Sequence, residues 1–236
     1  MAIWNPNEKS LFIHIPKSAG TSIVTWLKKS TWEEKVISHS NYAQVIKEDP
    51  RLKDAFSFAV VRNPWARLVS HYKFHCKTYE DKIDRLLGFG KNIYKKNLLK
   101  DVANPRKRSH KYNRLLHSAM CLWTLDKGFK NYVMDDSVND LVNGTNKWFD
   151  MRWTSQSEWI NSNTKILKYE NLQNDFKFIQ QKFKRNDPLP YINRTNKLGR
   201  HKQERDTSYR SWYDDELLEL TTKKFKRDCD AFEYKF

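Results

Sequence analysis

Apolar residues of this chain gather into three short runs of strand length, each ended by a turn signal. The three runs are residues 11–15, 56–61 and, more weakly, 165–169. Apolar positions of helical spacing follow each run, and these patterns cover residues 21–29, about 64–77 and about 172–184. Because alternating strands and helices pair into parallel sheets with right-handed crossovers, the pattern predicts an α/β fold with a central parallel sheet flanked by helices.

Two longer stretches lie outside this alternation. Residues 79–146 form a basic insertion with mostly helical apolar spacing, and residues 212–227 predict one amphipathic helix led by Asp214 and Asp215. A chain of 236 residues is long enough for one sizeable α/β domain. We therefore expect a single domain over residues 1–236, with the helical insertion inside it.

The charge balance is the strongest feature of the composition. Lysine and arginine exceed aspartate and glutamate by 16, while 39% of residues are hydrophobic, which is enough for a core. An excess of cations concentrates anionic partners near the surface. Nucleic acid, an acidic polysaccharide and a phosphorylated cofactor all fit this charge, and a merely solvated basic surface is the alternative.

The three cysteines, Cys76, Cys121 and Cys229, are widely spaced and odd in number. This spacing argues against a disulfide framework and against a zinc site, so we expect a reducing, cytoplasmic location. No apolar stretch approaches the roughly 20 residues of a membrane span. A luminal form of the protein, from which a membrane anchor has been trimmed, is the alternative.

The first strand runs directly into the turn "PKSAGTS", residues 16–22. A strand that turns tightly into a helix directs backbone N–H groups and the positive end of the helix dipole outward, which suits a phosphate. Lys17 adds a cation and Gly20 allows close approach of the backbone. Hydroxyls come from Ser18, Thr21 and Ser22. The spacing differs from the nucleotide loop G-x-x-x-x-G-K-[ST], and an ordinary turn with a hydroxyl N-cap is the alternative.

A second turn of this kind follows the next strand, in "FSFAVVRNPWARLVSHY", residues 56–72. Arg62 ends the strand and Pro64 suits the first helical position. Ligands of open parallel sheets bind outside the carboxyl ends of the strands, so Lys17 and Arg62 should converge on one crevice. Taken singly, Arg62 could be a structural cap and Ser70 a solvent-facing helix residue. Two turns suited to anions at the ends of adjacent strands predict instead a ligand with two separated phosphates.

The two stretches together resemble the phosphosulfate-binding and 3′-phosphate-binding segments of carbohydrate sulfotransferases of the family 2 type. The matching residues are 12–22 and 56–72, and residues 156–159, 168–176 and 209–236 extend the resemblance, whereas the insertion has no counterpart. Two positions depart from the family pattern. Ser18 replaces a threonine, and Ala19 replaces the first glycine, which is tolerable unless that position needs a positive φ.

The resemblance implies a fold similar to that of P-loop nucleotide hydrolases and a transfer of sulfuryl from 3′-phosphoadenosine-5′-phosphosulfate (PAPS) to a hydroxyl or amine. Adenosine 3′,5′-bisphosphate (PAP) is then released, and no metal is required. Lys17, with the amides and hydroxyls of Ser18, Ala19, Gly20, Thr21 and Ser22, would hold the phosphosulfate. Arg62 and Ser70 would hold the 3′-phosphate. Glu170 and Asn171 are expected to cap the helix that follows them and to orient the edge of the sheet.

A transfer of this kind needs a base for the acceptor's proton, and histidine suits that role. We favour His39, whose surroundings resemble a histidine motif of hexuronic 2-O-sulfotransferases. A structural or acceptor-binding role for His39 is the alternative. Glu33, Glu34 and His71 are the other candidates, and His14 is expected to be packed in the fold.

The acceptor is predicted only by class. Arg106, Lys107, Arg108 and Lys111 lie in the basic insertion, where they would line a groove for an acidic or sulfated glycan; a solvated helix face is the alternative. A small molecule or a tyrosine stays open as acceptor. A nucleotide-dependent kinase is the competing enzyme, but this chain lacks the correctly spaced nucleotide loop and an obvious carboxylate for magnesium. A nucleic-acid or polyanion-binding protein without catalysis fits the charge, but leaves the two turns unexplained.

Overall fold

The structure is a computed structural model that describes residues 2–30, 32–35, 40–86, 128–134, 151–192 and 208–236. The chain divides into two compact units. The first comprises Met1–Arg67, Trp153–Arg194 and Thr221–Phe236, and the second comprises Leu68–Arg152 and Thr195–Leu220. The single domain over residues 1–236 stays a prediction.

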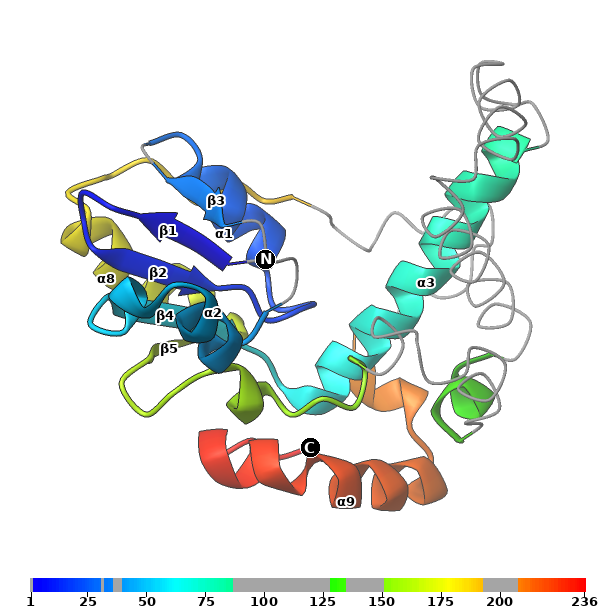
Figure 1. Ribbon diagram of the computed structural model, residues 1–236. Coiled ribbons are helices and arrows are strands. Elements are labelled where there is room, and N and C mark those ends of the chain that lie inside the picture. Colours follow the sequence, from blue (N-terminus) through cyan, green and yellow to red (C-terminus); the bar gives the residue numbers. More distant parts are fainter. Residues whose placement is uncertain (1, 31, 36–39, 87–127, 135–150, 193–207) are drawn as a thin grey trace, which may run out of the picture. The chain divides into compact units, whose positions relative to one another are not determined.

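The first unit contains a five-stranded sheet of order β3-β1-β2-β4-β5 (Figure 1). The strands are β1 (Ala2–Asn5), β2 (Ser10–Ile13), β3 (Glu33–Lys35), β4 (Phe56–Val61) and β5 (Lys165–Lys168). β2, β4 and β5 are parallel, whereas β1 runs antiparallel to both β2 and β3. The predicted α/β class and its three parallel strands are thus confirmed, and two short antiparallel strands are added to them.

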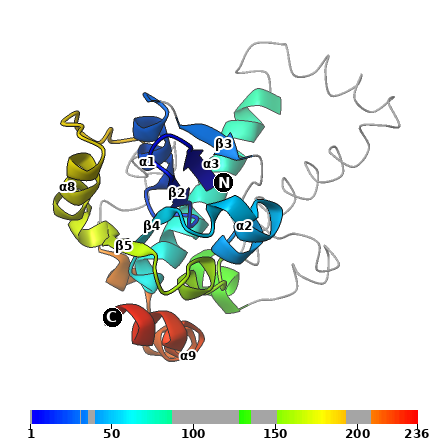
Figure 2. The same cartoon turned by 60° about the vertical axis from the view of Figure 1, so that its left-hand side comes forward.

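Helices α1 (Gly20–Leu27) and α8 (Leu172–Lys182) cover one face of this sheet. Trp26 of α1 and Phe176 of α8 meet edge to face at 4.9 Å and pack with Phe12 and Phe58 of the strands. Figure 2 shows α2 (Tyr42–Glu48) on the opposite face from α8. The core of the first unit is therefore a layer of aromatic and branched side chains between the sheet and α1 and α8.

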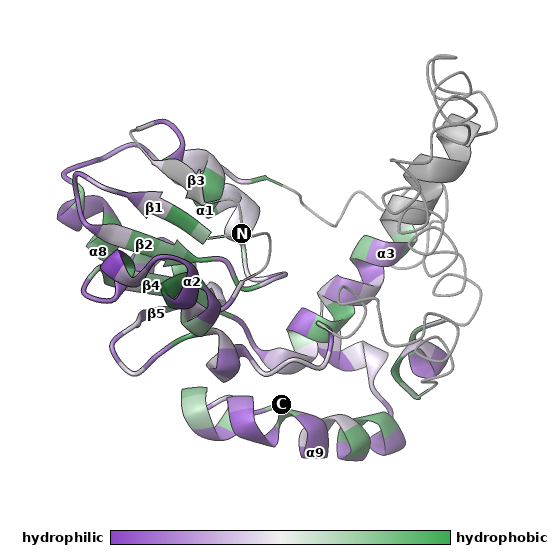
Figure 3. Ribbon diagram, in the orientation of Figure 1, coloured by the Kyte–Doolittle hydropathy of each residue, from purple (hydrophilic) through white to green (hydrophobic). Residues whose placement is uncertain are grey.

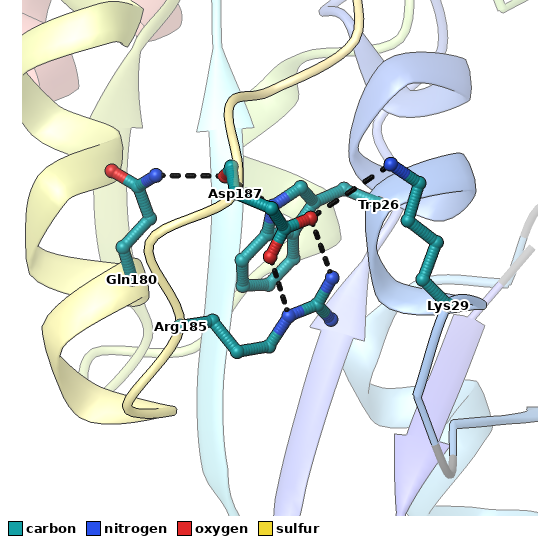
Figure 4. A network of polar contacts seen from close by, with 5 residues as sticks. All are labelled: Trp26, Lys29, Gln180, Arg185 and Asp187. Carbon is teal, nitrogen blue, oxygen red and sulfur yellow. Dashed lines mark hydrogen bonds and ion pairs between the residues drawn. The ribbon is translucent and has the colours of Figure 1, made fainter.

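Polar contacts tie the end of α1 to the segment after α8 (Figure 4). The Arg185 guanidinium donates to both carboxylate oxygens of Asp187, at 2.9 and 2.8 Å, and lies 3.6 Å from the centre of the Trp26 ring. Trp26 Nε1 and Gln180 Nε2 each donate to the Asp187 carbonyl at 2.9 Å. The Lys29 ammonium lies 3.9 Å from the same carboxylate, so this network fixes α1 against α8.

Two longer helices each pass through both units. α3 (Pro64–Leu86) begins at Pro64, as predicted, and α9 (Asp215–Phe232) begins three residues later than predicted. Asp214 caps α9, since its Oδ1 accepts from Leu217 N at 2.9 Å. Figure 3 shows hydrophobic and hydrophilic residues interspersed along α9. Its buried residues recur every three or four positions, as in an amphipathic helix; they are Leu217, Thr221, Phe225, Asp228 and Phe232.

Residues 128–134 are also helical, and the other short elements are turns of 3-10 helix. They are η1 (Pro50–Leu52), η3 (Gln156–Trp159), η4 (Tyr169–Asn171) and η5 (Tyr209–Trp212). Within the described ranges, no helix combines the length and the apolar character that crossing a membrane requires.

The second unit is organised around aromatic side chains. The Tyr72 ring lies 5.4 Å from Phe129, 5.4 Å from Tyr132 and 5.6 Å from Trp212, measured between ring centres. The buried Arg152 guanidinium donates to the Tyr132 carbonyl. Burial raises the pKa of the Tyr72 hydroxyl above its ordinary value, so this phenol stays protonated near neutral pH.

Candidate functional site

The turn between β2 and α1 contains two residues in the left-handed region of backbone space. Lys17 has a φ of 67°, and Ala19 has a φ of 58° and a ψ of 11°. The Ala19 carbonyl then accepts from Ser22 N at 3.0 Å and from Ile23 N at 3.2 Å, which starts α1. Turns with left-handed residues direct successive N–H groups into a concavity suited to an anion, and a helix N-terminus adds to this effect.

Ala19 occupies the position where the resembling family has glycine. The alanine was expected to be tolerable unless the position needs a positive φ, and the structure does place it at positive φ. Its side chain makes no capping hydrogen bond. A left-handed conformation costs a non-glycine residue roughly 1–2 kcal/mol, so the turn carries local strain here.

The structure shows why position 20 is a glycine, which the sequence did not reveal. A Cβ atom at this position would lie 1.9 Å from both Cδ2 and Nε2 of His14. The His14 ring also stacks on Phe12 at 6.0 Å between centres, which agrees with the packed role predicted for this histidine. Glycine is therefore required at position 20 by the imidazole beside it.

The remaining residues of the first turn differ in exposure. The Lys17 side chain is half-buried and Thr21 is exposed, whereas Ser18 and Ser22 are buried at 1% and 7% exposed. Ser18 Oγ makes a long contact of 3.4 Å with Gln156 Oε1, and Ser22 Oγ accepts from Ile192 N at 3.3 Å. Thr21 is therefore the one exposed residue among the three hydroxyl residues of this turn.

Arg62 follows β4 and reaches the first turn. Its Nη1 donates to the Lys17 carbonyl at 3.2 Å, and its guanidinium carbon lies 4.3 Å from the centre of the Tyr169 ring. Burial lowers the pKa of this guanidinium below its ordinary value, although an arginine remains charged at neutral pH. Within the described residues its Nε is buried without a hydrogen-bond partner. A guanidinium with an unused donor carries a charge that a neighbouring anion would stabilise.

The backbone after Arg62 is held by the C-terminal part of the chain. Asn63 N donates to Glu170 Oε1 at 2.7 Å, and the Tyr234 hydroxyl donates to Glu170 Oε2 at 2.9 Å. Asn171 makes no side-chain cap at α8; its amide donates to Asp175 Oδ1 at 2.7 Å instead. The prediction that Glu170 and Asn171 cap the following helix is therefore wrong, because the Glu170 carboxylate is used by the turn between β4 and α3.

The positions of several predicted site residues relative to the two turns are not described. His39, Arg106, Lys107, Arg108 and Lys111 lie outside the described residues. Glu33 and Glu34 form β3, but their side chains are not described. Ser70 and His71 lie on α3 in the second unit, where they are 8% and 3% exposed. Their predicted roles stay predictions.

Two buried residues that were not predicted hold the site together. Gln156, 0% exposed, and Asp228, 1% exposed, form a hydrogen bond of 3.1 Å behind the turns. The sequence "QSEW" marked this segment only through resemblance. Among the described residues, no cluster of three or more histidine, cysteine, aspartate or glutamate side chains could hold a metal ion.

The fold and the site define an α/β protein with two anion-suited turns that meet at the carboxyl ends of neighbouring parallel strands. The model of the sulfotransferase family, of the family-2 type, matches residues 1–235. The chain belongs to this family and is a sulfotransferase, an enzyme that transfers sulfuryl groups. Searches among curated proteins and among solved structures returned no match.

Proposed function

We propose that this sulfotransferase takes its sulfuryl group from PAPS and transfers it to a hydroxyl or an amine, with a carbohydrate as the acceptor. The observation that carries the proposal is the hydrogen bond of 3.2 Å from Arg62 Nη1 to the Lys17 carbonyl. This contact joins the turns after β2 and β4 into one polar surface. PAPS carries a phosphosulfate on the 5′ position of its ribose and a phosphate on the 3′ position, and each turn suits one of them.

The residues present fit this donor. The N–H groups at the start of α1 and the Lys17 ammonium would hold the phosphosulfate and stabilise the charge that develops as PAP leaves. The guanidinium of the half-buried Arg62, whose Nη1 donates to the Lys17 carbonyl, would bind the 3′-phosphate, which ATP lacks. Ser70 stays a predicted partner of that phosphate.

The reaction itself is an in-line displacement. A bond forms between the acceptor oxygen and sulfur while the bond from sulfur to the donor's 5′-phosphate oxygen breaks, and a base removes the acceptor's proton. We propose His39 as that base, since an imidazole of ordinary pKa accepts a proton near neutral pH.

Calorimetry with four ligands tests the donor assignment. We expect PAP to bind more tightly than adenosine 5′-phosphate, ATP with magnesium or an oligonucleotide. Arg62→Ala should reduce the preference for PAP over adenosine 5′-phosphate by about 10- to 100-fold, because a charged hydrogen bond contributes about 1.5–3 kcal/mol. Arg51→Ala is the matched control, since Arg51 is an exposed arginine paired with Asp49. Equal weakening of both nucleotides by Arg62→Ala would contradict the assignment.

The acceptor proposal rests on charge. The chain carries 16 excess cations, and Arg106, Lys107, Arg108 and Lys111 form the most basic part of the insertion. An acidic or already sulfated glycan would be attracted to such a surface. Its affinity should then fall steeply with salt, because exposed charges are screened beyond roughly 8 Å at physiological ionic strength.

A second basic surface provides a control for the proposed acceptor site. A hollow of about 730 Å³ beside η3 and α9 is lined by Ser157, Lys223, Lys224, Lys226, Arg227, Asp230 and Ala231. In a sulfation assay with a glycan panel, replacing Arg106, Lys107 and Arg108 together by alanine should raise the acceptor KM and flatten its salt dependence. Lys223→Ala with Lys224→Ala should not. The reverse result would move the acceptor to the hollow, and no effect from either variant would contradict an acidic acceptor.

A further inference from the structure

One buried side chain contacts both turns of the donor site. The Gln156 carboxamide accepts through Oε1 from Arg62 N at 2.9 Å and from Ser18 Oγ at 3.4 Å. Through Nε2 it donates to the Arg62 carbonyl at 2.7 Å and to Asp228 Oδ2 at 3.1 Å. A carboxamide offers two hydrogens and two acceptor positions, so all four are in use.

Asp228 determines which way this carboxamide points. A carboxylate can only accept, so the Nε2 side of Gln156 must face it. The other carboxylate oxygen of Asp228 accepts from Ser157 N at 3.2 Å and from the Ser155 hydroxyl, which fixes the carboxylate to η3. With Nε2 held on this side, Oε1 is left to face the Arg62 N–H and the Ser18 hydroxyl.

The contacts to Arg62 and Ser18 have different strengths. Gln156 holds the backbone of Arg62 on both sides, through its N–H and its carbonyl, with two short hydrogen bonds. The contact to the Ser18 hydroxyl is long, so this hydroxyl is oriented while it can still turn toward a ligand. Any shift of the carboxamide would move the Arg62 backbone at the start of one turn and change the orientation of the Ser18 hydroxyl in the other.

We propose that Gln156, oriented by Asp228, is a positioning residue that couples the two ends of the donor site. It places Arg62 for the 3′-phosphate and Ser18 for the 5′-phosphosulfate, so both ends of the donor are recognised in one fixed spacing. This inference rests on the proposed use of PAPS.

Gln156→Glu tests the coupling with little change in shape. Ionised or protonated, the glutamate has at most one hydrogen to donate, and the Asp228 carboxylate competes for it. The Arg62 carbonyl then faces an oxygen without a hydrogen. By calorimetry at pH 8, the preference for PAP over adenosine 5′-phosphate should fall by about tenfold or more, since losing one buried donor costs about 1–3 kcal/mol.

A double variant separates positioning from folding. In Gln156→Glu with Asp228→Asn, the new amide at position 228 can donate to the glutamate, so the contact between the two positions returns. The Arg62 carbonyl still lacks its donor. Urea denaturation should therefore show recovered stability, whereas the preference for PAP should stay low. If the Gln156→Glu variant does not fold, the PAP preference of the double variant is compared directly with that of the wild-type protein.

Ser57→Ala is the control for a buried hydrogen bond that touches neither turn. Ser57 Oγ lies 3.1 Å from Thr164 Oγ1 in the same unit. Its loss should reduce stability and leave the PAP preference at the wild-type value. An unchanged preference in Gln156→Glu, or a preference that recovers together with stability in the double variant, would overturn the inference. A wild-type protein without any preference for PAP would instead overturn the proposed donor.

Discussion

Replacing Ala19 by glycine should stabilise the protein, although such a change inside a helix normally weakens it. Ala19 has a φ of 58° and a ψ of 11° and makes no side-chain cap. Relief of the left-handed strain is worth roughly 1–2 kcal/mol. The greater freedom of glycine in the unfolded chain removes about 0.5–1 kcal/mol of this gain. We therefore expect a net increase in the free energy of unfolding of up to about 1.5 kcal/mol, with a central value of about 0.8 kcal/mol.

The measurement is urea denaturation without ligand, supported by a thermal scan. For a chain of this length, 1 kcal/mol corresponds to a change of about 2–4 °C in Tm. Ala43→Gly is the matched control, since it makes the same chemical change at an exposed position of α2. It should lower the free energy of unfolding by up to about 1 kcal/mol, because the residue there is helical.

Opposite signs for the two glycine variants would support the local strain at Ala19. A loss of stability in both variants would refute it, since that result would mean that position 19 does not adopt a left-handed conformation in solution. The comparison also isolates the backbone, because neither substitution adds an atom that could clash.

Four further outcomes are expected. Lys17→Ala should lower kcat by about 10²-fold while the Kd for PAP changes little, because charge grows on the leaving oxygen in the transition state; a change in KM alone would contradict this. His39→Ala should leave PAP binding intact and slow single-turnover transfer by ~10²- to 10⁴-fold, and normal transfer would move the base elsewhere. Asp187→Asn should reduce the free energy of unfolding by about 1 kcal/mol at pH 7. The Arg185 contact lowers the pKa of Asp187, so this difference should be present above the unfolded pKa of about 4 and vanish as the pH falls through the folded value. Burial raises the pKa of Cys229 to about 11. Peptide-level alkylation at pH 8 should therefore modify it about 100-fold more slowly than an ordinary exposed thiol, and equal rates would contradict the raised pKa.

The sequence predicted the elements whose signals are local. The parallel strands β2, β4 and β5 each carry a continuous apolar run that ends in a turn, and Pro64 marks the start of α3. Strands β1 and β3 were missed because each is very short and pairs antiparallel at one side of the sheet. A strand of three or four residues is stabilised by its neighbours and carries too few positions for a periodic signal.

Lys17 and Arg62 could be predicted to converge because both follow strands of the same parallel sheet. Topology predicts that these two strand ends lie close together, but the particular hydrogen bond from Arg62 Nη1 to the Lys17 carbonyl could be seen only in the structure. The conformation of Ala19 could not be predicted in this way. The sequence itself does not distinguish an alanine at positive φ from any other alanine. The only signal was the glycine that the resembling family has at this position.

Glu170, Gln156 and Asp228 show why the rest of the site stayed hidden. Residues that face a ligand lie together in the chain, because a turn brings consecutive groups to one point. The residues that hold such a turn come from distant segments: Gln156 lies 94 positions from Arg62 and 72 from Asp228. Each backbone group that a turn removes from water needs a partner, and any segment that reaches it can supply one. Polar residues whose hydrogen-bonding capacity is fully used behind a turn are therefore where the determinants of its geometry should be sought, and here that position is Gln156.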